Sequence, residues 1–506
     1  MKQKQTVEKS IFIPSILLVA CLAVCILLMP ESSSKIIYRL FDFLTNELGW
    51  LYLAIAAVIL FFSLWAAFSK YGRIRLGGEN EKKQYSEFHW SSMMFTAGMG
   101  VGVAVLSFIE PLSFLASEYF DVVPLSDKAY EYAHMYDQFL WGISGWAIYV
   151  PATLAVAYIL FIKKGKVLRM SSTCEDLFSS EKTKKLSGRI IDVISVFGTV
   201  GGMATTLGMA VPTLTVLIEY FIGIPQSFLL TCSVLAVFVV IFGSSVYFGL
   251  EKGIKNLSSI NMYIFGLFII AVAFKTPLLK VLNLELNSIG LMFDNFWELT
   301  FGTDPFSKGG FSHDWVIFYW AWFLAFVPMM ALFVARISKG RTVRQLVLGE
   351  IIWGAGGSMS VFALFGGYSL HLQKTGTVDL VSVLKTSGSE RTIVAILETL
   401  PVPGIIFIIY ALLLTLFIST TMDSTAYVLS SICTRQITGD EQPARWNRML
   451  WALLLALFAL GFILIGGLQT VQTASIVTGF PMLFVSVITM VSARKMFKSH
   501  SGKNML

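Results

Sequence analysis

Of the 506 residues in this chain, 56% are hydrophobic and only 14% carry a charge. About a quarter of the residues in a typical soluble domain are charged, so the composition excludes an ordinary soluble protein. Apolar runs long enough to cross a bilayer recur from end to end, whereas a β-barrel would show alternating segments of roughly ten residues. We therefore predict an all-α polytopic membrane protein.

Twelve membrane-spanning helices are predicted. The first apolar run is long for the core of a signal peptide and lacks a cleavage site of small residues, so we expect it to be retained as a span. The predicted spans cover residues 11–29, 49–69, 89–116, 137–162, 190–220, 226–248, 256–276, 313–335, 345–371, 400–432, 447–467 and 472–493.

The distribution of charge predicts the orientation. With the N-terminus inside, the cytoplasmic segments hold 29 of the 38 Lys and Arg residues, most densely after the second and fourth spans, and the positive-inside rule then places both termini in the cytoplasm. An odd number of spans would leave the basic tail outside, which favours twelve. Topology and attraction to anionic lipid also account for the net charge of +7, so no nucleic-acid partner is expected.

Two external stretches do not read as spans. Residues 282–300 mix acidic and aromatic side chains and are typical of an interfacial helix, and residues 373–399 contain a second amphipathic segment. Their spacing is compatible with two inverted five-helix units preceded by two extra helices. The predicted divisions are 1–88 (N-terminal segment and two peripheral spans), 89–276 (first repeat), 277–312 (external interfacial helix), 313–495 (second repeat) and 496–506 (short cytoplasmic tail).

The third predicted span contains three alternate glycines, Gly98, Gly100 and Gly102, followed by Glu110. Each glycine costs a helix interior about 1 kcal/mol relative to alanine. They could allow the backbone to unwind and free carbonyls for a cation, or they could serve close packing between helices. The spacing alone leaves both readings open. For Glu110, a structural role between helices is favoured over a direct role in transport.

Aromatic residues gather in the fourth and eighth spans. Trp141, Trp146 and Tyr149 lie in the fourth, and the eighth runs FYWAW (318–322) through Phe323 and Phe326 into the basic sequence ARISKGRT (335–342). A quaternary ammonium ion has no N–H to donate, so aromatic faces are the natural way to hold it. Composition alone would favour aromatic residues that only fill space.

The FYWAW and ARISKGRT elements, together with the Gly-Met-Gly-x-Gly stretch, resemble the signature of the betaine/carnitine/choline transporter family over nearly the whole chain. The resemblance implies a leucine-transporter-type fold of five plus five helices that works by alternating access. It also implies that Trp141, Trp146 and Tyr149 bind the substrate, with Phe323 and Phe326 at positions that often hold tryptophan. Met99 and Met330 are further candidates for contact with the substrate, and family members are commonly homotrimers.

The tenth span carries adjacent hydroxyls at Thr420 and Thr421, which could supply hard oxygen ligands for sodium or could bond back to their own helix. The resemblance implies that sodium-coupled members build one site from the positions of Thr96, Met99, Phe417, Thr420 and Thr421. It also implies a neutral Asn261 where sodium-independent exchangers carry an arginine. Only Met330 points toward such an exchanger. Asp423 is expected to play a structural part.

Other classes of function lack support in the sequence. The five cysteines are scattered at no metal-ligand spacing, and the five histidines fall at span edges, in loops or in the tail, so neither catalysis nor a resident cofactor is expected. The short termini argue against osmotic sensing by a long tail. We therefore expect a bacterial inner-membrane importer of glycine betaine, choline, carnitine or a relative, with sodium as the coupling ion. The alternative is a sodium-independent substrate/product exchanger.

Overall fold

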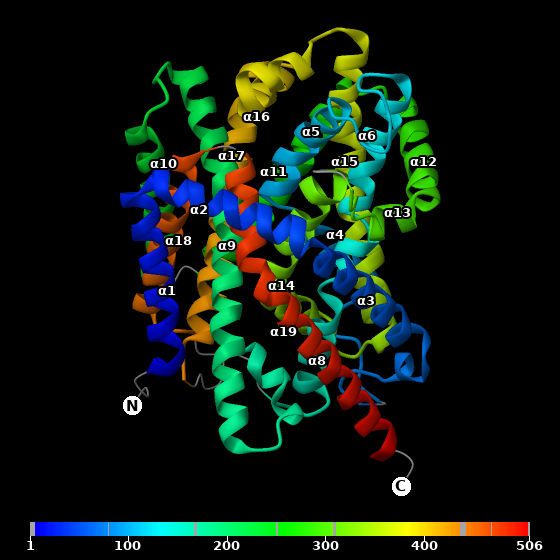
Figure 1. Cartoon of the computed structure of the whole chain (residues 1–506), viewed down its shortest axis with the longest axis vertical. Helices are drawn as coiled ribbons and strands as arrows, with labels where there is room; N and C mark the ends of the chain where they lie inside the picture. The colour runs from blue at the N-terminus through cyan, green and yellow to red at the C-terminus, as the bar shows by residue number, and fades with distance from the viewer. Residues whose placement is uncertain are drawn as a thin grey trace.

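The computed structural model describes residues 6–78, 80–165, 169–248, 251–306, 310–435, 442–466 and 468–503. Within these residues the chain is nearly all helical, and the β-type pairings are two isolated bridges, Val7 with Thr434 and Arg75 with Thr342. Long helices form one bundle, and α1 begins and α19 ends at the same end of the molecule (Figure 1). The expectation of an all-α polytopic membrane protein is therefore confirmed.

The α-helices, in chain order, are α1 (Lys9–Leu28), α2 (Pro30–Asp42), α3 (Gly49–Phe68), α4 (Glu87–Thr96), α5 (Val101–Leu115), α6 (Asp127–Leu140), α7 (Ile143–Ala147), α8 (Val150–Phe161), α9 (Glu181–Ile222), α10 (Phe228–Phe248), α11 (Glu251–Lys275), α12 (Leu278–Asp294), α13 (Phe296–Phe301), α14 (Ile317–Ile337), α15 (Val343–Thr375), α16 (Leu380–Glu398), α17 (Pro403–Ile432), α18 (Arg445–Ile465) and α19 (Leu468–Lys503). Short helical turns complete the list: η1 (Phe43–Glu47), η2 (Lys70–Arg73), η3 (Met170–Thr173), η4 (Glu175–Leu177) and η5 (Ser312–Val316).

Each of the twelve predicted spans contains a helix. In the described part of the chain, nine helical segments are long and apolar enough to cross a membrane. The number is eleven if each of two bent pairs of helices is counted as one span. The described apolar part of α10 is shorter, from Phe228 to Ile241. Two predicted segments extend beyond the described residues: the span 447–467 at residue 467, and the tail at residues 504–506. α19 continues as a helix through residues 496–503 of the predicted tail.

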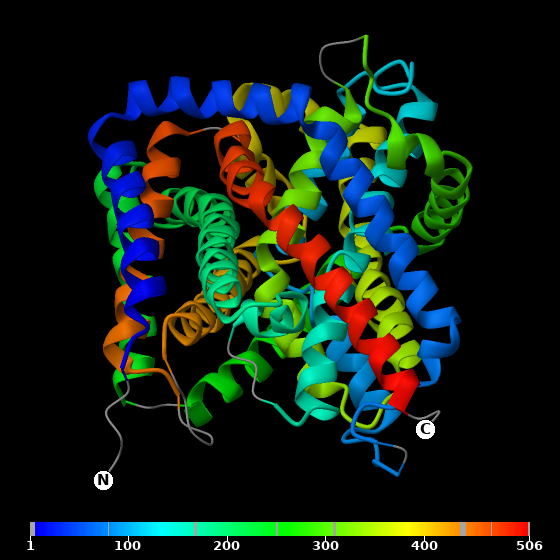
Figure 2. The same ribbon diagram turned by 60° about the horizontal axis from the view of Figure 1, so that its bottom comes forward.

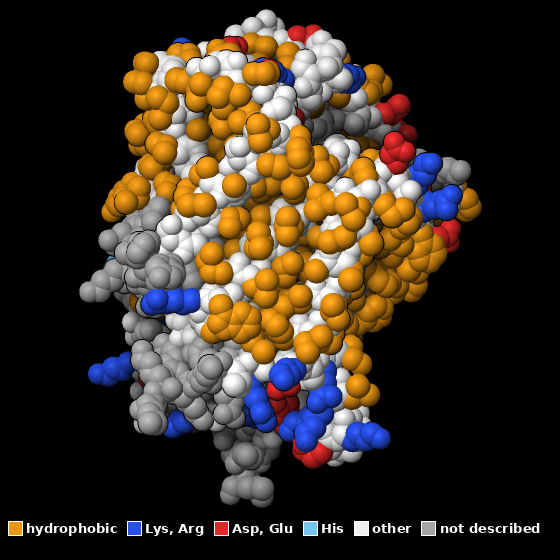
Figure 3. Space-filling view, turned by 90° about the vertical axis from the view of Figure 1, so that its left-hand side faces the viewer, with side chains coloured by type: hydrophobic (Ala, Val, Ile, Leu, Met, Phe, Trp, Pro, Cys, Tyr) orange, Lys and Arg blue, Asp and Glu red, His pale blue; other side chains and the backbone are white. Residues whose placement is uncertain are grey.

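The surface of the bundle fits a lipid environment. Figure 3 shows a broad band of hydrophobic side chains on one side, with Lys, Arg, Asp and Glu gathered below it and at its upper right. Large apolar side chains such as Leu17, Leu28 and Leu229 are exposed. Exposed apolar area of this extent would be costly in water, whereas it is expected against lipid tails.

The helices outside the predicted spans include α2, α12 and α13. The amphipathic helix α2 was not predicted from the sequence, and it lies across one end of the bundle between α1 and α3 (Figure 2). The predicted interfacial stretch 282–300 corresponds to α12 and α13. Because α12 turns by 101° from the helix before it, this stretch does not continue that span.

The basic sequence after α14 stabilises the fold at the predicted cytoplasmic end. Arg341 is buried, donates to Glu87 Oε2 at 2.5 Å, and lies over the ring of Trp90 at 3.8 Å. Gly340 adopts a left-handed backbone with φ of 79°, and a Cβ there would lie 2.2 Å from the carbonyl oxygen of Lys82. The predicted basic cluster therefore joins the loop after α3 to the start of α15.

Candidate functional site

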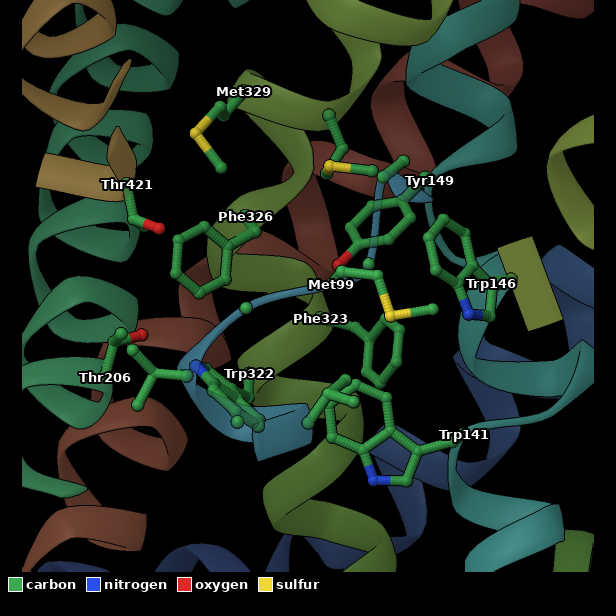
Figure 4. Close-up of a pocket in the computed structure, with 17 residues that line it drawn as sticks. Met99, Trp141, Trp146, Tyr149, Thr206, Trp322, Phe323, Phe326, Met329 and Thr421 are labelled. Atoms are coloured by element: carbon green, nitrogen blue, oxygen red, sulfur yellow. The ribbon is translucent and has the colours of Figure 1, made fainter. Parts of the chain in front are cut away.

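A cavity of 120 Å³ lies in the middle of the bundle between α5, α6 to α8, α9, α14 and α17. Every side chain predicted to contact the substrate lines it. Its walls are formed by Ala97, Gly98, Met99, Gly100, Val101, Gly102, Val103, Trp141, Trp146, Tyr149, Thr206, Trp322, Phe323, Phe326, Met329, Met330 and Thr421 (Figure 4).

The chain between α4 and α5 reaches this cavity because it is not helical. α4 ends at Thr96, α5 begins at Val101, and their axes differ by 60°. Gly100 is fully extended, with φ of −165° and ψ of −166°. The geometry agrees with the first of the two readings of the glycines, an unwound backbone, and residues 97–103 line the cavity.

Two of the three glycines also make room for tryptophan rings. A Cβ on Gly98 would lie 2.5 Å from Trp146 Cζ2, and one on Gly102 would lie 2.4 Å from Trp322 Cη2. A Cβ on Gly100, in contrast, would meet nothing within 4 Å. The sequence left unwinding and close packing as alternatives, and the structure combines them within five residues.

The fourth span is interrupted where its aromatic residues lie, which the sequence did not predict. Trp141 follows the end of α6, α7 covers only Ile143–Ala147, and Tyr149 precedes α8. A Cβ on Gly142 would lie 2.3 Å from the Gln138 carbonyl oxygen, so only glycine fits this turn. The predicted span 137–162 is therefore not one continuous helix.

The aromatic rings contact one another around the cavity. Phe323 lies at the centre, with its ring centroid 5.9 Å from that of Trp141 and 5.5 Å from that of Tyr149. Trp146 packs edge-on against Tyr149 at 5.8 Å, and Trp322 lies 6.4 Å from Phe326. These separations are within the range of favourable aromatic pairs, which hold the rings in place without a ligand.

All three indole N–H groups of the cavity are bound to acceptors of the protein. Trp141 Nε1 donates to Tyr319 Oη at 3.0 Å, and Trp146 Nε1 donates to Ser358 Oγ at 3.3 Å. Trp322 Nε1 donates to the carbonyl oxygen of Gly202 at 3.4 Å. With their N–H groups occupied elsewhere, the indoles present carbon and π-faces to the cavity, which suits an onium cation.

The residues predicted to hold sodium do not all meet at the cavity. Met99 and Thr421 line it, whereas Thr96, Phe417 and Thr420 do not. Thr96 Oγ1 donates to the Ser92 carbonyl oxygen at 2.9 Å, and Thr420 Oγ1 donates to that of Leu416 at 2.9 Å. Both hydroxyls therefore bond back to their own helices in this conformation.

Two other residues singled out from the sequence, Asp423 and Asn261, and two neighbouring threonines of α9 have defined surroundings. Asp423 accepts a hydrogen bond from Arg448 Nη2 at 2.5 Å, which ties α17 to α18 and fits the expected structural part. Asn261 is buried in α11. Thr205 bonds to Ser475 Oγ at 2.8 Å and so faces α19, while Thr206 beside it lines the cavity.

Two large side chains of the cavity, Trp322 and Met329, are among the lining residues that were not predicted. Trp322 lies four residues before Phe326, so the helical repeat of α14 could have placed both on one face. Met329 neighbours the predicted Met330, and both line the cavity directly after Pro328 of α14.

Comparison with known families agrees with the geometry of the site. A family model described as BCCT, betaine/carnitine/choline family transporter, matches residues 10–502, which is nearly the whole chain. Members of this family are transporters and not enzymes, and they bind small quaternary ammonium substrates. The chain belongs to the betaine/carnitine/choline transporter family.

Proposed function

We propose that this protein imports a quaternary ammonium compound, such as glycine betaine, choline or carnitine, by sodium symport with alternating access. The observation that carries this proposal is the cavity of aromatic faces whose three indole N–H groups are all bound to acceptors of the protein. A methylated ammonium group can replace its hydration shell there with π-faces, each desolvated contact contributing about 2 kcal/mol.

In this proposal Trp141, Trp146, Tyr149 and Phe323 surround the ammonium group, and Phe326, Met99 and Met330 contact the rest of the substrate. The Tyr149 hydroxyl is directed toward Met99 in the middle of the cavity (Figure 4). It is therefore placed to donate a hydrogen bond to a carboxylate or hydroxyl of the substrate. Phenylalanine at positions 323 and 326 has a weaker π-face than tryptophan. Its ring is also smaller, which leaves room for a bulkier ligand.

Sodium would bind between the broken segment and α17. Its proposed ligands are the backbone around Thr96, Met99 and Phe417 and the hydroxyls of Thr420 and Thr421. Thr421 lines the cavity opposite Met99, which supports the choice of this pair of elements. Thr96 and Thr420 would have to exchange their helix carbonyl partners for the ion. Sodium would thereby brace the non-helical segment against α17 and favour the state that accepts substrate.

The architecture proposed for this mechanism is twelve spans with two inverted five-helix repeats, 89–276 and 313–495, and both termini in the cytoplasm of a bacterial cell. We further propose a homotrimer with α12 at the contact between protomers. This helix exposes Leu279, Leu282 and Leu286 and lies outside the bundle. Mass measurement of the detergent-solubilised protein tests the trimer, and Leu282→Glu, which introduces a charge at the proposed contact, should yield monomers.

The second candidate function is sodium-independent exchange of one onium compound for another. One observation favours it, namely that Met330 lines the cavity. Binding measurements separate the two candidates. For a symporter, the dissociation constants of betaine, choline and carnitine, measured by tryptophan fluorescence, should fall when sodium replaces potassium. For an exchanger, they should be the same in both salts.

A further inference from the structure

Behind the aromatic cavity lie two buried carboxyl groups that the proposed mechanism does not use. Glu110 on α5 and Asp137 on α6 are both 0% exposed, and their carboxyl groups face each other within hydrogen-bonding reach. Both oxygens of Asp137 and Oε2 of Glu110 receive no hydrogen bond from any N–H or O–H group of the described residues. No Lys or Arg of the described chain acts on either group.

Such a pair must hold a proton. Two ionised carboxylates repel each other and cannot hydrogen-bond, and burial without a counter-charge makes the doubly ionised form still more costly. With one shared proton, the pair can form a hydrogen bond and carries a single negative charge. The sequence alone does not predict this arrangement, because the two residues lie on different predicted spans.

The pair is connected to the cavity by one tyrosine hydroxyl. Tyr319 Oη donates to Glu110 Oε1 and accepts from Trp141 Nε1 at 3.0 Å. The indole ring of Trp141 lines the cavity, and its nitrogen is directed away from the centre (Figure 4). Negative charge on the pair therefore polarises the Trp141 ring through this chain of hydrogen bonds, which makes its π-face a better acceptor for a cation.

The pair is connected on its other side to a partly exposed acid. Glu285 on α12 acts electrostatically on Asp137, and its side chain is 19% exposed. His134, one turn before Asp137, lies with Nδ1 3.8 Å from Glu285 Oε2 and 2.8 Å from Ser288 Oγ. A proton that leaves the pair thus has a titratable group between it and the surface of the bundle.

The remaining neighbours leave the pair electrostatically isolated. From α15, Gly366 approaches so closely that a Cβ there would lie 3.4 Å from Asp137 Oδ2, and His371 interacts with Lys280 instead. Among the described residues, α9, α16 and α17, which also pack against α5, contribute no titratable group that acts on the pair. The titratable groups that face it are therefore Tyr319 and Glu285, and His134 lies 3.8 Å from Glu285.

We propose that Glu110 and Asp137 form a proton site linked to the cavity, such that binding of an onium cation releases the shared proton. A positive charge on the face of Trp141 favours the doubly ionised pair, and thermodynamic reciprocity requires that loss of the proton strengthens cation binding. The proton balance is one proton from the pair to solvent for each cation bound. The proposal rests on the proposed function only in that an onium ion is the ligand, and it is independent of sodium.

The test uses the purified full-length protein in detergent with choline, a simple cation, and glycine betaine, which also carries a carboxylate. We expect the dissociation constant of choline to fall about fivefold or more between about pH 5 and about pH 9, as is typical of linked sites. Glycine betaine should show a smaller change, because its carboxylate offsets part of the positive charge. Choline added to weakly buffered protein should release protons, as read with a pH-sensitive dye.

The variant Asp137→Asn should bind choline with an affinity that no longer depends on pH, and it should release no proton. The matched control is Glu350→Gln, which removes another fully buried carboxyl, one bonded to Thr153 Oγ1 at 2.9 Å and not part of the pair. This control should keep both the pH dependence and the proton release.

Three results would overturn the linkage: choline binding by the wild type without proton release, an unchanged pH dependence in Asp137→Asn, or loss of the effect in Glu350→Gln alone. If Asp137→Asn fails to fold, the wild-type proton release decides the question. Absence of choline and betaine binding at every pH would contradict the proposed function together with the linkage, whereas pH-independent binding would contradict the linkage alone.

Discussion

The aromatic cavity and the hydroxyl-bearing stretch of α17 were predicted by the same resemblance, yet they differ in this structure. All seven predicted substrate residues line one cavity. Of the five predicted sodium residues, only Met99 and Thr421 do. The difference lies in what each kind of side chain can do within its own helix.

The helix that carries a tryptophan cannot bury the whole indole ring. The ring must therefore pack against other elements, and the fold sets its position. A threonine hydroxyl can always donate to the carbonyl four residues earlier. Thr96 and Thr420 do this here, at 2.9 Å each. A site made of aromatic rings can therefore be formed before the substrate binds. A site made of hydroxyl groups forms only when an ion replaces the helix carbonyls as their partner. The following predictions test this contrast, starting with the largest effect.

Trp146→Ala should weaken substrate binding about thirtyfold, the equivalent of one desolvated cation–π contact of about 2 kcal/mol. The affinity of Trp146→Phe for the substrate should fall between those of Trp146→Ala and the wild type, because phenylalanine keeps a weaker π-face. Trp320→Phe serves as the control, since Trp320 is buried on α14 but does not line the cavity. Equal affinities for Trp146→Ala and the wild type, by tryptophan fluorescence or calorimetry, would show that the rings do not hold the substrate.

Gly98→Ala should lower the rate of uptake about tenfold, because the new methyl group would lie 2.5 Å from the Trp146 ring and overpacking typically costs 1–3 kcal/mol. Gly100→Ala is the matched control, since its Cβ meets nothing within 4 Å and its backbone is extended. Initial uptake rates into proteoliposomes compare the two variants. A larger loss for Gly100→Ala would mean that freedom of the backbone, and not room for the ring, is what matters there.

Thr421→Ala should raise the sodium concentration for half-maximal uptake about fivefold, as expected for one lost oxygen ligand of about 1 kcal/mol. Thr420→Ala should have a smaller effect, because that hydroxyl must give up its bonds to Leu416 and Phe417 before it can bind an ion. Sodium titrations of uptake provide the measurement. If neither variant shifts the titration, sodium does not bind at α17.

Phe323→Trp should change the ratio of betaine, choline and carnitine affinities by about threefold without abolishing binding, since a larger ring strengthens the π-face and narrows the cavity. Competition of each compound against labelled substrate gives the ratios. An unchanged ratio would place Phe323, which contacts Trp141 and Tyr149, outside the part of the cavity that selects the substrate.

The sequence could predict features that repeat along the chain. Apolar runs located a helix in each of the twelve predicted spans, and the alternate glycines after Thr96 predicted a break. Features that depend on contacts across the bundle escaped it. The interruption at Trp141 and Gly142 carries only one glycine as a signal, and α2 is short and amphipathic. Glu110 and Asp137 lie on different spans and meet only when α5 packs against α6.

The central claim is sodium-driven uptake of an onium compound, and the most direct test is uptake of labelled glycine betaine, choline and carnitine into proteoliposomes. An inward sodium gradient should drive accumulation of at least one of them into vesicles that contain no substrate. Replacing sodium with potassium on both sides should abolish that accumulation. Uptake that ignores sodium and requires substrate preloaded inside the vesicles would contradict symport and establish exchange.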